Sequence, residues 1–330
     1  MKKIVLFMAY YGKMPNYFNL WLETAKDNET IDFCVISDCC DEYELPKNVR
    51  YKKLSFDEFK NKLQMKFDFK ILLNNYGRIS QFRPAFAYVF PDEVDNYDFW
   101  GYVECDLLLG DIRKFLTDDL LEKYDKFLYT GHLQLFKNNN EMNTLFMKKS
   151  ARALDYKFAF SNNIYFFEEY IGMYNLAKAY NIKTWYERVY ADINCHYYGF
   201  KAILKENNDK LTSCIIRRKD KKMYAVYLNN SNEIEEHEVL YTHFQKRALQ
   251  LETSDKEKYI IVPNKVVEDK IIDKGFWNEV ETDINKEEAV YENRMSEYFL
   301  QDKKKRYKQF CWIKMYFRRI IIKLMGGRDL

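Results

Sequence analysis

The chain has 330 residues, with 18% aromatic side chains, 31% charged side chains and a formal net charge of +3. The aromatic content excludes a disordered polypeptide, and the length suffices for one large α/β domain or two smaller ones with a sizeable core. Residues 303–328 carry ten Lys or Arg and no acid, a local charge of +10. The rest of the chain therefore has a net charge of 3 − 10 = −7. An acidic main body argues against nucleic-acid binding.

The cysteines and the apolar runs predict a cytosolic protein. The seven cysteines are odd in number and include no Cys-x-x-Cys pair, so we expect reduced thiols. No apolar run reaches the length of a membrane span. The N-terminal apolar run is interrupted at Tyr10 and lacks the small-residue cleavage site of a signal peptide.

The first forty residues predict a strand, a helix and a second strand. Residues 3–9 and 31–37 are apolar on both faces, and the intervening residues place apolar side chains at helical spacing. Such a unit predicts parallel pairing, and ligands bind beyond the carboxyl ends of parallel strands. We therefore expect Tyr10, Tyr11 and Asp38, which follow those ends, at one crevice. Asp38 is equally well interpreted as a turn or capping residue.

Two helix starts follow a short predicted strand at residues 51–54. Ser55 and Glu58 have the spacing of a capping box, before a helix that continues over residues 59–67. Arg83 precedes a proline, which favours the first turn of a helix. A guanidinium at a helix start is well suited to bind phosphate, although a plain surface arginine has the same pattern.

Residues 97–111 carry the most informative pattern. An aromatic and apolar run over residues 99–103 predicts a buried strand, and Glu104 and Asp106 follow it directly. If the strand stays extended, these two carboxylates share a face and repel each other unless a cation lies between them. Oxygen ligands suit Mg²⁺ or Mn²⁺, and such ions usually also bind substrate phosphates. The alternative is a solvated acidic turn after a core strand.

This block resembles the Asp-x-Asp signature of GT-A-fold glycosyltransferases. The sequence YDFWGYVECDLLLGD is similar to the YDFWGxxDxDxxxGD pattern of bacterial enzymes that build capsular and O-antigen polysaccharides, with Glu104 in the first acidic place. The resemblance implies that Glu104 and Asp106 hold Mn²⁺ or Mg²⁺, which holds the diphosphate of a nucleotide sugar, with a UDP-sugar as the expected donor. It also implies that Tyr10, Tyr11 and Asp38 contact the nucleotide.

Two looser segments resemble the same group of enzymes. Residues 79–90 are similar to a D-[FY]-[KR]-P-A-[FY]-G segment, with two departures, and imply that Arg83 meets the donor diphosphate or sugar. Residues 131–138 are similar to a GHxxxxKN segment and imply that His132 and Lys137 line the acceptor or sugar pocket. A histidine beside apolar residues is more often structural, so this role of His132 is the weaker interpretation.

Two further segments of the resemblance lie downstream. A segment similar to [FY]-D-E-x-x-G implies that Glu169, or Glu168, acts as general base on an acceptor hydroxyl if the enzyme inverts the anomeric centre. The alternative for these two acids is a solvated helix start. A segment similar to HxQKR implies that His243 is the third metal ligand and that Lys246 lies near the diphosphate. A strand-end histidine beside solvated basic residues is the alternative.

The last third of the chain predicts three further features. Alternating strand-like runs and turns over residues 210–244 predict a small antiparallel sheet. Residues 252–297 predict charged surface helices, with one strand at residues 259–262. Residues 303–325 predict a basic amphipathic helix with aromatic side chains, which suits an anionic membrane surface. The alternative is a helix packed on the core or on a partner subunit.

These features predict an α/β fold of the GT-A type: a mostly parallel central sheet with helices on both faces, a small antiparallel sheet and a C-terminal basic amphipathic helix. We expect a glycosyltransferase domain over residues 1–250, with nucleotide-sugar binding in 1–111 and acceptor binding in 112–250. A peripheral segment, 251–302, and a membrane-associating tail, 303–330, would follow.

The expected activity is metal-dependent transfer of a hexose from a UDP-sugar to a saccharide acceptor. A lipid-linked acceptor would place the protein in the cytoplasm, peripherally on the inner face of the cell membrane. A sugar-phosphate nucleotidyltransferase is an alternative, although the glycine-rich N-terminal loop of such enzymes is missing from the sequence. A non-catalytic, membrane-associated sugar-binding protein is another.

Overall fold

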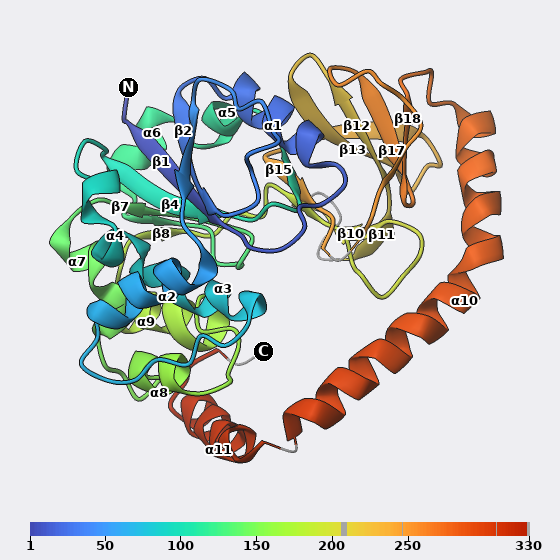
Figure 1. The fold of residues 1–330 in the computed structure, drawn as a ribbon. Helices are drawn as coiled ribbons and strands as arrows, with labels where there is room; N and C mark the ends of the chain where they lie inside the picture. Colours follow the sequence, from blue (N-terminus) through green and yellow to red (C-terminus); the bar gives the residue numbers. More distant parts are fainter. Residues whose placement is uncertain (206–209, 246, 308, 329–330) are drawn as a thin grey trace.

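The computed structural model describes residues 1–205, 210–245, 247–307 and 309–328 (Figure 1). Within these residues, the largest sheet has seven strands. In sheet order they are β3 (Val49–Lys53), β2 (Ile31–Ser37), β1 (Ile4–Ala9), β4 (Phe99–Val103), β7 (Leu133–Lys137), β6 (Lys126–Phe127) and β8 (Thr184–Trp185). Only β7 among them runs against the others, since it pairs antiparallel with β4 and β6. The predicted mostly parallel α/β sheet is confirmed.

Alternate residues of β1 feed two cores on opposite faces of this sheet. Ile4, Leu6 and Met8 pack into the first core, and Val5 and Phe7 pack into the second. A strand buried on both faces is apolar throughout, which is why β1 and β2 were readable from the sequence.

Helices close both cores, as predicted (Figure 1). The first face is covered by α1 (Phe18–Asp27), α5 (Ile112–Phe115) and α6 (Asp118–Lys123). The second face is covered by α2 (Phe56–Met65), α3 (Ile79–Phe82), α4 (Phe86–Val89), α7 (Asn140–Asn143), α8 (Tyr156–Ser161) and α9 (Asn175–Ala179). The predicted capping box at the start of α2 is present: Ser55 accepts from the Glu58 N–H, and the Glu58 carboxylate accepts from the Ser55 N–H at 2.8 Å. Such a cap contributes about 1 kcal/mol.

Short one-turn segments link these helices. They are the 3₁₀ turns η1 (Tyr76–Arg78), η2 (Arg83–Ala85), η3 (Pro91–Glu93) and η4 (Leu145–Met147), and the π-helical turn η5 (Tyr170–Tyr174). Arg83 therefore begins a 3₁₀ turn ahead of the four-residue helix α4.

Smaller sheets follow the central one. A six-stranded sheet has the order β14 (Ile234–Val239), β13 (Lys222–Leu228), β12 (Ile215–Lys219), β17 (Tyr259–Val262), β18 (Lys265–Glu268) and β16 (Gln250–Leu251). Its pairs are antiparallel except β16 with β18, and β10 (Lys201–Ile203) pairs antiparallel with β11 (Leu211–Ser213). The predicted antiparallel sheet is confirmed. The strand predicted to end at His243 is instead divided at Leu240, and its second part belongs to another sheet.

That other sheet joins the two halves of the chain. It has the order β5 (Leu107–Leu109), β15 (Tyr241–His243) and β9 (Ala191–Asp192). β15 pairs antiparallel with β5 and parallel with β9. Residues more than a hundred positions apart in the sequence therefore meet directly beyond the end of β4.

Two helices complete the described chain. The long helix α10 (Lys274–Tyr307) runs along the outside from the six-stranded sheet toward the opposite end of the molecule, where α11 (Phe310–Leu324) lies below α8 (Figure 1). α11 buries Trp312, Met315 and Ile322 in the second core. Its other side exposes Ile313, Tyr316, Phe317, Ile320, Ile321 and Leu324. Among the described residues, no helix combines the length and apolarity needed to cross a membrane.

Candidate active site

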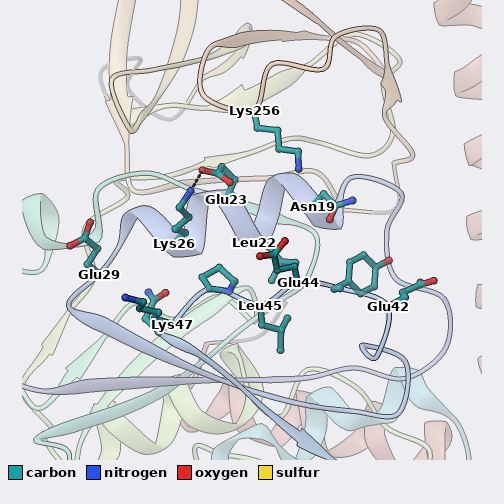
Figure 2. Close-up of a pocket in the computed structure, with 13 residues that line it drawn as sticks. Asn19, Leu22, Glu23, Lys26, Glu29, Glu42, Glu44, Leu45, Lys47 and Lys256 are labelled. Carbon is teal, nitrogen blue, oxygen red and sulfur yellow. Dashed lines mark hydrogen bonds and ion pairs between the residues drawn. The ribbon is translucent and has the colours of Figure 1, made fainter.

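A cavity of about 730 Å³ opens at the carboxyl ends of β1 and β4. Its wall contains most of the residues expected from the sequence: Tyr10, Tyr11, Arg83, Glu104, Asp106, His132, Glu168, Glu169 and His243. A larger cavity, about 1250 Å³, lies between α1 and residues 42–48 (Figure 2). That cavity is lined by acids and lysines, including an ion pair of Glu23 with Lys26, and by none of the expected site residues. The smaller cavity is therefore the candidate active site.

Strand pairing brings the acidic block to His243. Residues 104–106 form a turn between β4 and β5, which corrects the expectation that they continue an extended strand. The turn forms because β5 leaves the central sheet and pairs with β15, with Leu107 opposite His243. Both carboxylates still face one cavity, but the turn and the pairing place them there.

Glu104, Asp106 and His243 form a candidate metal centre. His243 Nε2 lies 3.3 Å from Glu104 Oε2 and 3.6 Å from Asp106 Oδ2. One ligand atom from each residue lies within 4.8 Å of the other two. The two carboxylates are 23% and 25% exposed, so they remain open to the cavity. One imidazole nitrogen with two carboxylates is a donor set that fits Mn²⁺ and, less well, Mg²⁺.

The charge of His243 is set by the carboxylates around it. Burial lowers the pKa of His243, but Asp106, Asp192 and Glu104 outweigh burial and raise that pKa well above its ordinary value. Without metal, the ring is a cation between carboxylates. A divalent ion that binds Nε2 must displace this proton, so metal binding is favoured by rising pH.

Arg83 is tied to the first acid of the block. Its Nη1 lies 2.7 Å from Glu104 Oε1 and donates to Gly131 O at 2.9 Å. Burial raises the pKa of Glu104, but Arg83 and then His243 outweigh burial and hold it well below its usual range. Burial and the charge of Glu104 raise the pKa of Asp106, although His243 opposes them. Glu104 is thus the permanently ionised member of the pair.

Asp192 is a site residue without a predicted role, although residues 190–193 resemble a further segment of the same glycosyltransferases. β9 pairs with β15 so that Asp192 lies opposite His243. Asp192 Oδ1 lies 2.8 Å from His243 Nδ1 and accepts from Gln245 Nε2 at 2.9 Å. A carboxylate on Nδ1 fixes the imidazole so that Nε2 faces Glu104 and Asp106. A two-residue strand leaves no periodic pattern, so only the tertiary pairing identifies it.

We expect Asp192→Ala to weaken Mn²⁺ binding about 10- to 100-fold, because His243 loses the partner that orients its ring. Calorimetric titration of the purified protein with Mn²⁺ measures the change. Asp192→Asn, which keeps an acceptor for the Nδ1–H, should bind Mn²⁺ with intermediate affinity. Wild-type affinity in the alanine variant would show that His243 needs no such partner.

His132 and Lys137, the two residues expected at the pocket, lie at opposite ends of β7. The His132 ring centroid lies 3.8 Å from that of His243, and burial, then His243, lower the pKa of His132 to about 4. His132 is therefore a neutral member of the cavity wall. Lys137 lies at the other end of β7 and pairs with Asp125 at 3.2 Å. A five-residue strand spans about 17 Å, so the prediction that Lys137 lines the pocket is wrong.

Glu168 and Glu169 lie on a constrained segment. Phe166, just before them, has a φ of 74°, which is rare for a bulky residue. Glu168 is 4% exposed and accepts from Gln81 Nε2 at 2.9 Å. Glu169 Oε1 accepts from the Gly131 N–H at 2.8 Å, and a Cβ at position 131 would lie 2.6 Å from this oxygen. Burial and then Glu168 raise the pKa of Glu169 to about 8, so this carboxyl exchanges a proton near neutral pH.

The raised pKa of Glu169 has a consequence for stability. Since it lies above the ordinary value of 4.5, folding favours the protonated carboxyl, and this stabilisation is lost as the pH rises from 4.5 to about 8. Glutamine mimics the protonated form and still accepts from the Gly131 N–H. We expect Glu169→Gln to raise the free energy of unfolding at pH 9 by about 2 kcal/mol, with no gain at pH 4.

Urea unfolding of both proteins at the two pH values measures this difference. Glu141→Gln, at an exposed carboxylate, is the control and should change neither value. Parallel pH dependence of the wild type and the Glu169→Gln variant would contradict the raised pKa.

Of the residues expected near the nucleotide, some line the cavity and others do not. Tyr11 is 2% exposed, and its hydroxyl has no hydrogen-bond partner among the described residues. Tyr10 also lines the cavity and donates from its hydroxyl to Lys13 O at 2.9 Å. Asp38 follows β2 as predicted but is exposed and lies outside the cavity wall. Lys246 lies outside the described residues.

Comparison with known proteins gives the family. The sequence model of a family of unknown function, DUF6625, matches residues 6–270. The chain belongs to this family. The matched range contains all the candidate site residues, from Tyr10 to Lys246. No curated protein gives a significant match to this DUF6625 sequence.

Solved structures similar to this DUF6625 chain include three glycosyltransferases. Mouse xyloside xylosyltransferase 1 has a TM-score of 0.35 and 10% identity, over 58% of this chain and 88% of that one. A glycosyltransferase involved in the glycosylation of the major capsid of PBCV-1 has a TM-score of 0.33 and 8% identity, over 57% of this chain and 84% of that one. The galactosyltransferase LgtC has a TM-score of 0.26 and 12% identity, over 44% of this chain. The match spans about 60% of the length of LgtC. With TM-scores below 0.5, these likenesses do not identify an activity.

Proposed function

We propose that this protein is a metal-dependent glycosyltransferase of the GT-A type, which moves a hexose from a UDP-sugar to a saccharide acceptor. One observation carries the proposal: Glu104, Asp106 and His243 converge in a single cavity at the carboxyl edge of a mostly parallel sheet. The cavity volume of about 730 Å³ suits a ligand of nucleotide-sugar size. These residues come from the turn between β4 and β5 and from β15, and residues 1–250 are the proposed catalytic unit.

Glu104, Asp106 and His243 are the proposed ligands of Mn²⁺ or Mg²⁺. When bound, such an ion supplies positive charge to the diphosphate that leaves the sugar. Arg83, beside Glu104, and Lys246 are proposed to add positive charge on the same side. The buried hydroxyl of Tyr11, without a partner among the described residues, supports a polar contact with the donor. Tyr10 and Asp38 are the proposed neighbours of the nucleotide.

Glu169 is the proposed general base. It takes the proton of the acceptor hydroxyl as that oxygen attacks the anomeric carbon and the bond from this carbon to the diphosphate oxygen breaks. A pKa of about 8 is close to the optimum for a base that works near neutral pH. Glu168 is the alternative base, but it is more buried and bonded to Gln81, which favours a supporting role.

The proposed acceptor is a lipid-linked saccharide at the inner face of a bacterial membrane, in the synthesis of capsular or O-antigen polysaccharide. α11 supports this, because it packs on the core through one side and exposes an apolar side next to Lys314, Arg318 and Lys323. Such a helix suits an anionic bilayer surface. Residues 303–325 are therefore the proposed membrane contact.

A product-release assay tests the activity. Purified protein is incubated with a panel of UDP-sugars and a sugar acceptor, with and without Mn²⁺, and the release of UDP and of pyrophosphate is measured. UDP release that requires Mn²⁺ is the expected result. Pyrophosphate release from a nucleoside triphosphate and a sugar phosphate would indicate a nucleotidyltransferase, and binding without turnover would indicate a sugar-binding protein.

A further inference from the structure

A separate basic cavity lies where the C-terminal tail meets α9. It has a volume of about 420 Å³. The described residues that line it are Arg152, Tyr174, Asn175, Lys178, Gly326, Gly327 and Arg328, and none of these is an acid. Among the described residues, no carboxylate forms an ion pair with Arg152, Lys178 or Arg328. Three cations around one hollow, with no counter-ion from the described part of the chain, favour an anionic ligand.

The tail that closes this cavity is held by specific contacts. Asn175 is 2% exposed, and its side chain accepts from the Arg328 N–H and donates to Arg328 O, both at 2.7 Å. A Cβ at Gly327 would lie 2.4 Å from Arg152 O, so glycine is needed for the tail to pack this closely. The cavity is therefore a built feature of the fold.

Aromatic rings hold two of the cations in place. The Arg328 guanidinium lies 4.4 Å from the centroid of the Tyr170 ring, and Lys178 Nζ lies 4.5 Å from that of Tyr186. Cation–π contacts restrict these side chains without neutralising them. Two guanidinium groups and one ammonium suit the several oxygens of a phosphate group.

The position of the cavity favours a phosphate carried by a lipid. Gly326 and Gly327 follow α11 almost directly, and the last apolar side chains before them, Leu324 and Met325, are 80% and 49% exposed. The exposed apolar side of α11 therefore ends at the basic cavity. The hydrocarbon chain of a lipid could contact the apolar side of α11 while its phosphate binds the three cations of the cavity.

We propose that the cavity of Arg152, Lys178 and Arg328 binds the phosphate group of the lipid that carries the acceptor. Tyr170, which contacts Arg328, directly follows Glu169, so the cavity borders the segment that bears the proposed base. A phosphate held there presents the attached saccharide on the side of the active site where Glu169 lies. This inference rests on the proposed function and names its acceptor class.

Vesicle flotation tests the proposal without measuring transfer. The full chain is floated with phosphatidylcholine vesicles that contain either a polyprenyl phosphate or, at equal surface charge, oleate. We expect the wild type to prefer the phosphate vesicles. Combining Arg152→Gln, Lys178→Gln and Arg328→Gln should reduce this preference at least about fivefold, because cations near a phosphate are lost.

The matched control removes three charges from α11 by Lys314→Gln, Arg318→Gln and Lys323→Gln. It should weaken binding to both kinds of vesicle and leave the preference unchanged. An unchanged preference in the cavity variant would overturn the proposal. Inorganic phosphate that binds the wild type but not the cavity variant, with no preference of the wild type for the phosphate vesicles, would assign the cavity to free phosphate and overturn the lipid assignment.

A further variant separates this inference from the proposed function. Asp106→Ala lies in the other cavity and should keep the preference for polyprenyl phosphate, whatever its activity. If the wild type shows the preference but no sugar transfer, the proposed function fails and the lipid site stands. If transfer occurs without the preference, only the lipid site fails.

Discussion

Asp106→Ala should lower kcat/KM for sugar transfer by about a thousandfold or more, because the diphosphate loses the positive charge that stabilises its departure. Asp106 is 25% exposed at the cavity, so the variant should fold. UDP release from a donor sugar at saturating Mn²⁺ measures the rate, and circular dichroism checks the fold.

The control for this variant is Asp92→Ala, at an exposed acid in η3 away from the cavity wall. It should retain wild-type activity. Near-normal turnover in the folded Asp106→Ala protein would contradict the role of this carboxylate in metal binding.

Glu169→Gln should lower kcat by about 10²- to 10⁴-fold, because the acceptor hydroxyl loses the group that takes its proton. A base works in its deprotonated form. Wild-type kcat/KM should therefore rise with pH through the pKa of about 8 and level off above it. A pH profile of both proteins between pH 6 and about 10, at saturating Mn²⁺, measures this rise.

Glu168→Gln is the matched comparison, since the two acids are neighbours. It should reduce kcat less and keep an inflection, because Glu169 remains, but move it below pH 8, because the Glu168 charge that raises the pKa of Glu169 is lost. The opposite assignment follows if the inflection persists in Glu169→Gln and vanishes in Glu168→Gln.

Glu169→Gln combines a loss of activity with a gain in stability at pH 9. Substitution of a residue with a purely structural role would lower both the activity and the stability. Activity and stability are expected to change in opposite directions when a functional carboxylate is buried, because burial makes its charged form unfavourable. Measuring both in one preparation therefore distinguishes a catalytic residue from a packing residue.

The central sheet was predictable because its signals are local. β1 and β2 are continuous apolar runs, and the spacing of Ser55 and Glu58 predicted the start of α2 without any distant contact. The same holds for the position of the acidic block after β4, because a buried strand must end before it exposes two acids.

The parts of the site that depend on pairing between strands far apart in the sequence could not be predicted from local signals. Glu104 and Asp106 were expected on one strand face, but they occupy a turn, because β5 pairs with a strand more than 130 residues away. Asp192 lies on a two-residue strand without periodicity. Lys137 was misplaced because β7 runs antiparallel to its neighbours, which carries its end away from the cavity.

The C-terminal helix shows why one sequence pattern allowed two interpretations. The amphipathic pattern of residues 303–325 suited a membrane surface or a packed helix. α11 buries Trp312, Met315 and Ile322, yet it exposes a second apolar side. Periodicity alone does not separate these sides, since both contain aromatic and aliphatic residues at helical spacing.

Binding of UDP with and without Mn²⁺ tests the central claim most directly. Isothermal titration of the wild type and of Asp106→Ala at pH 8 compares the four conditions. We predict that UDP binds the wild type only when Mn²⁺ is present, and that the variant binds UDP in neither condition. Equal UDP affinity with and without Mn²⁺, or Mn²⁺-dependent binding that survives in Asp106→Ala, would contradict a metal held by these residues.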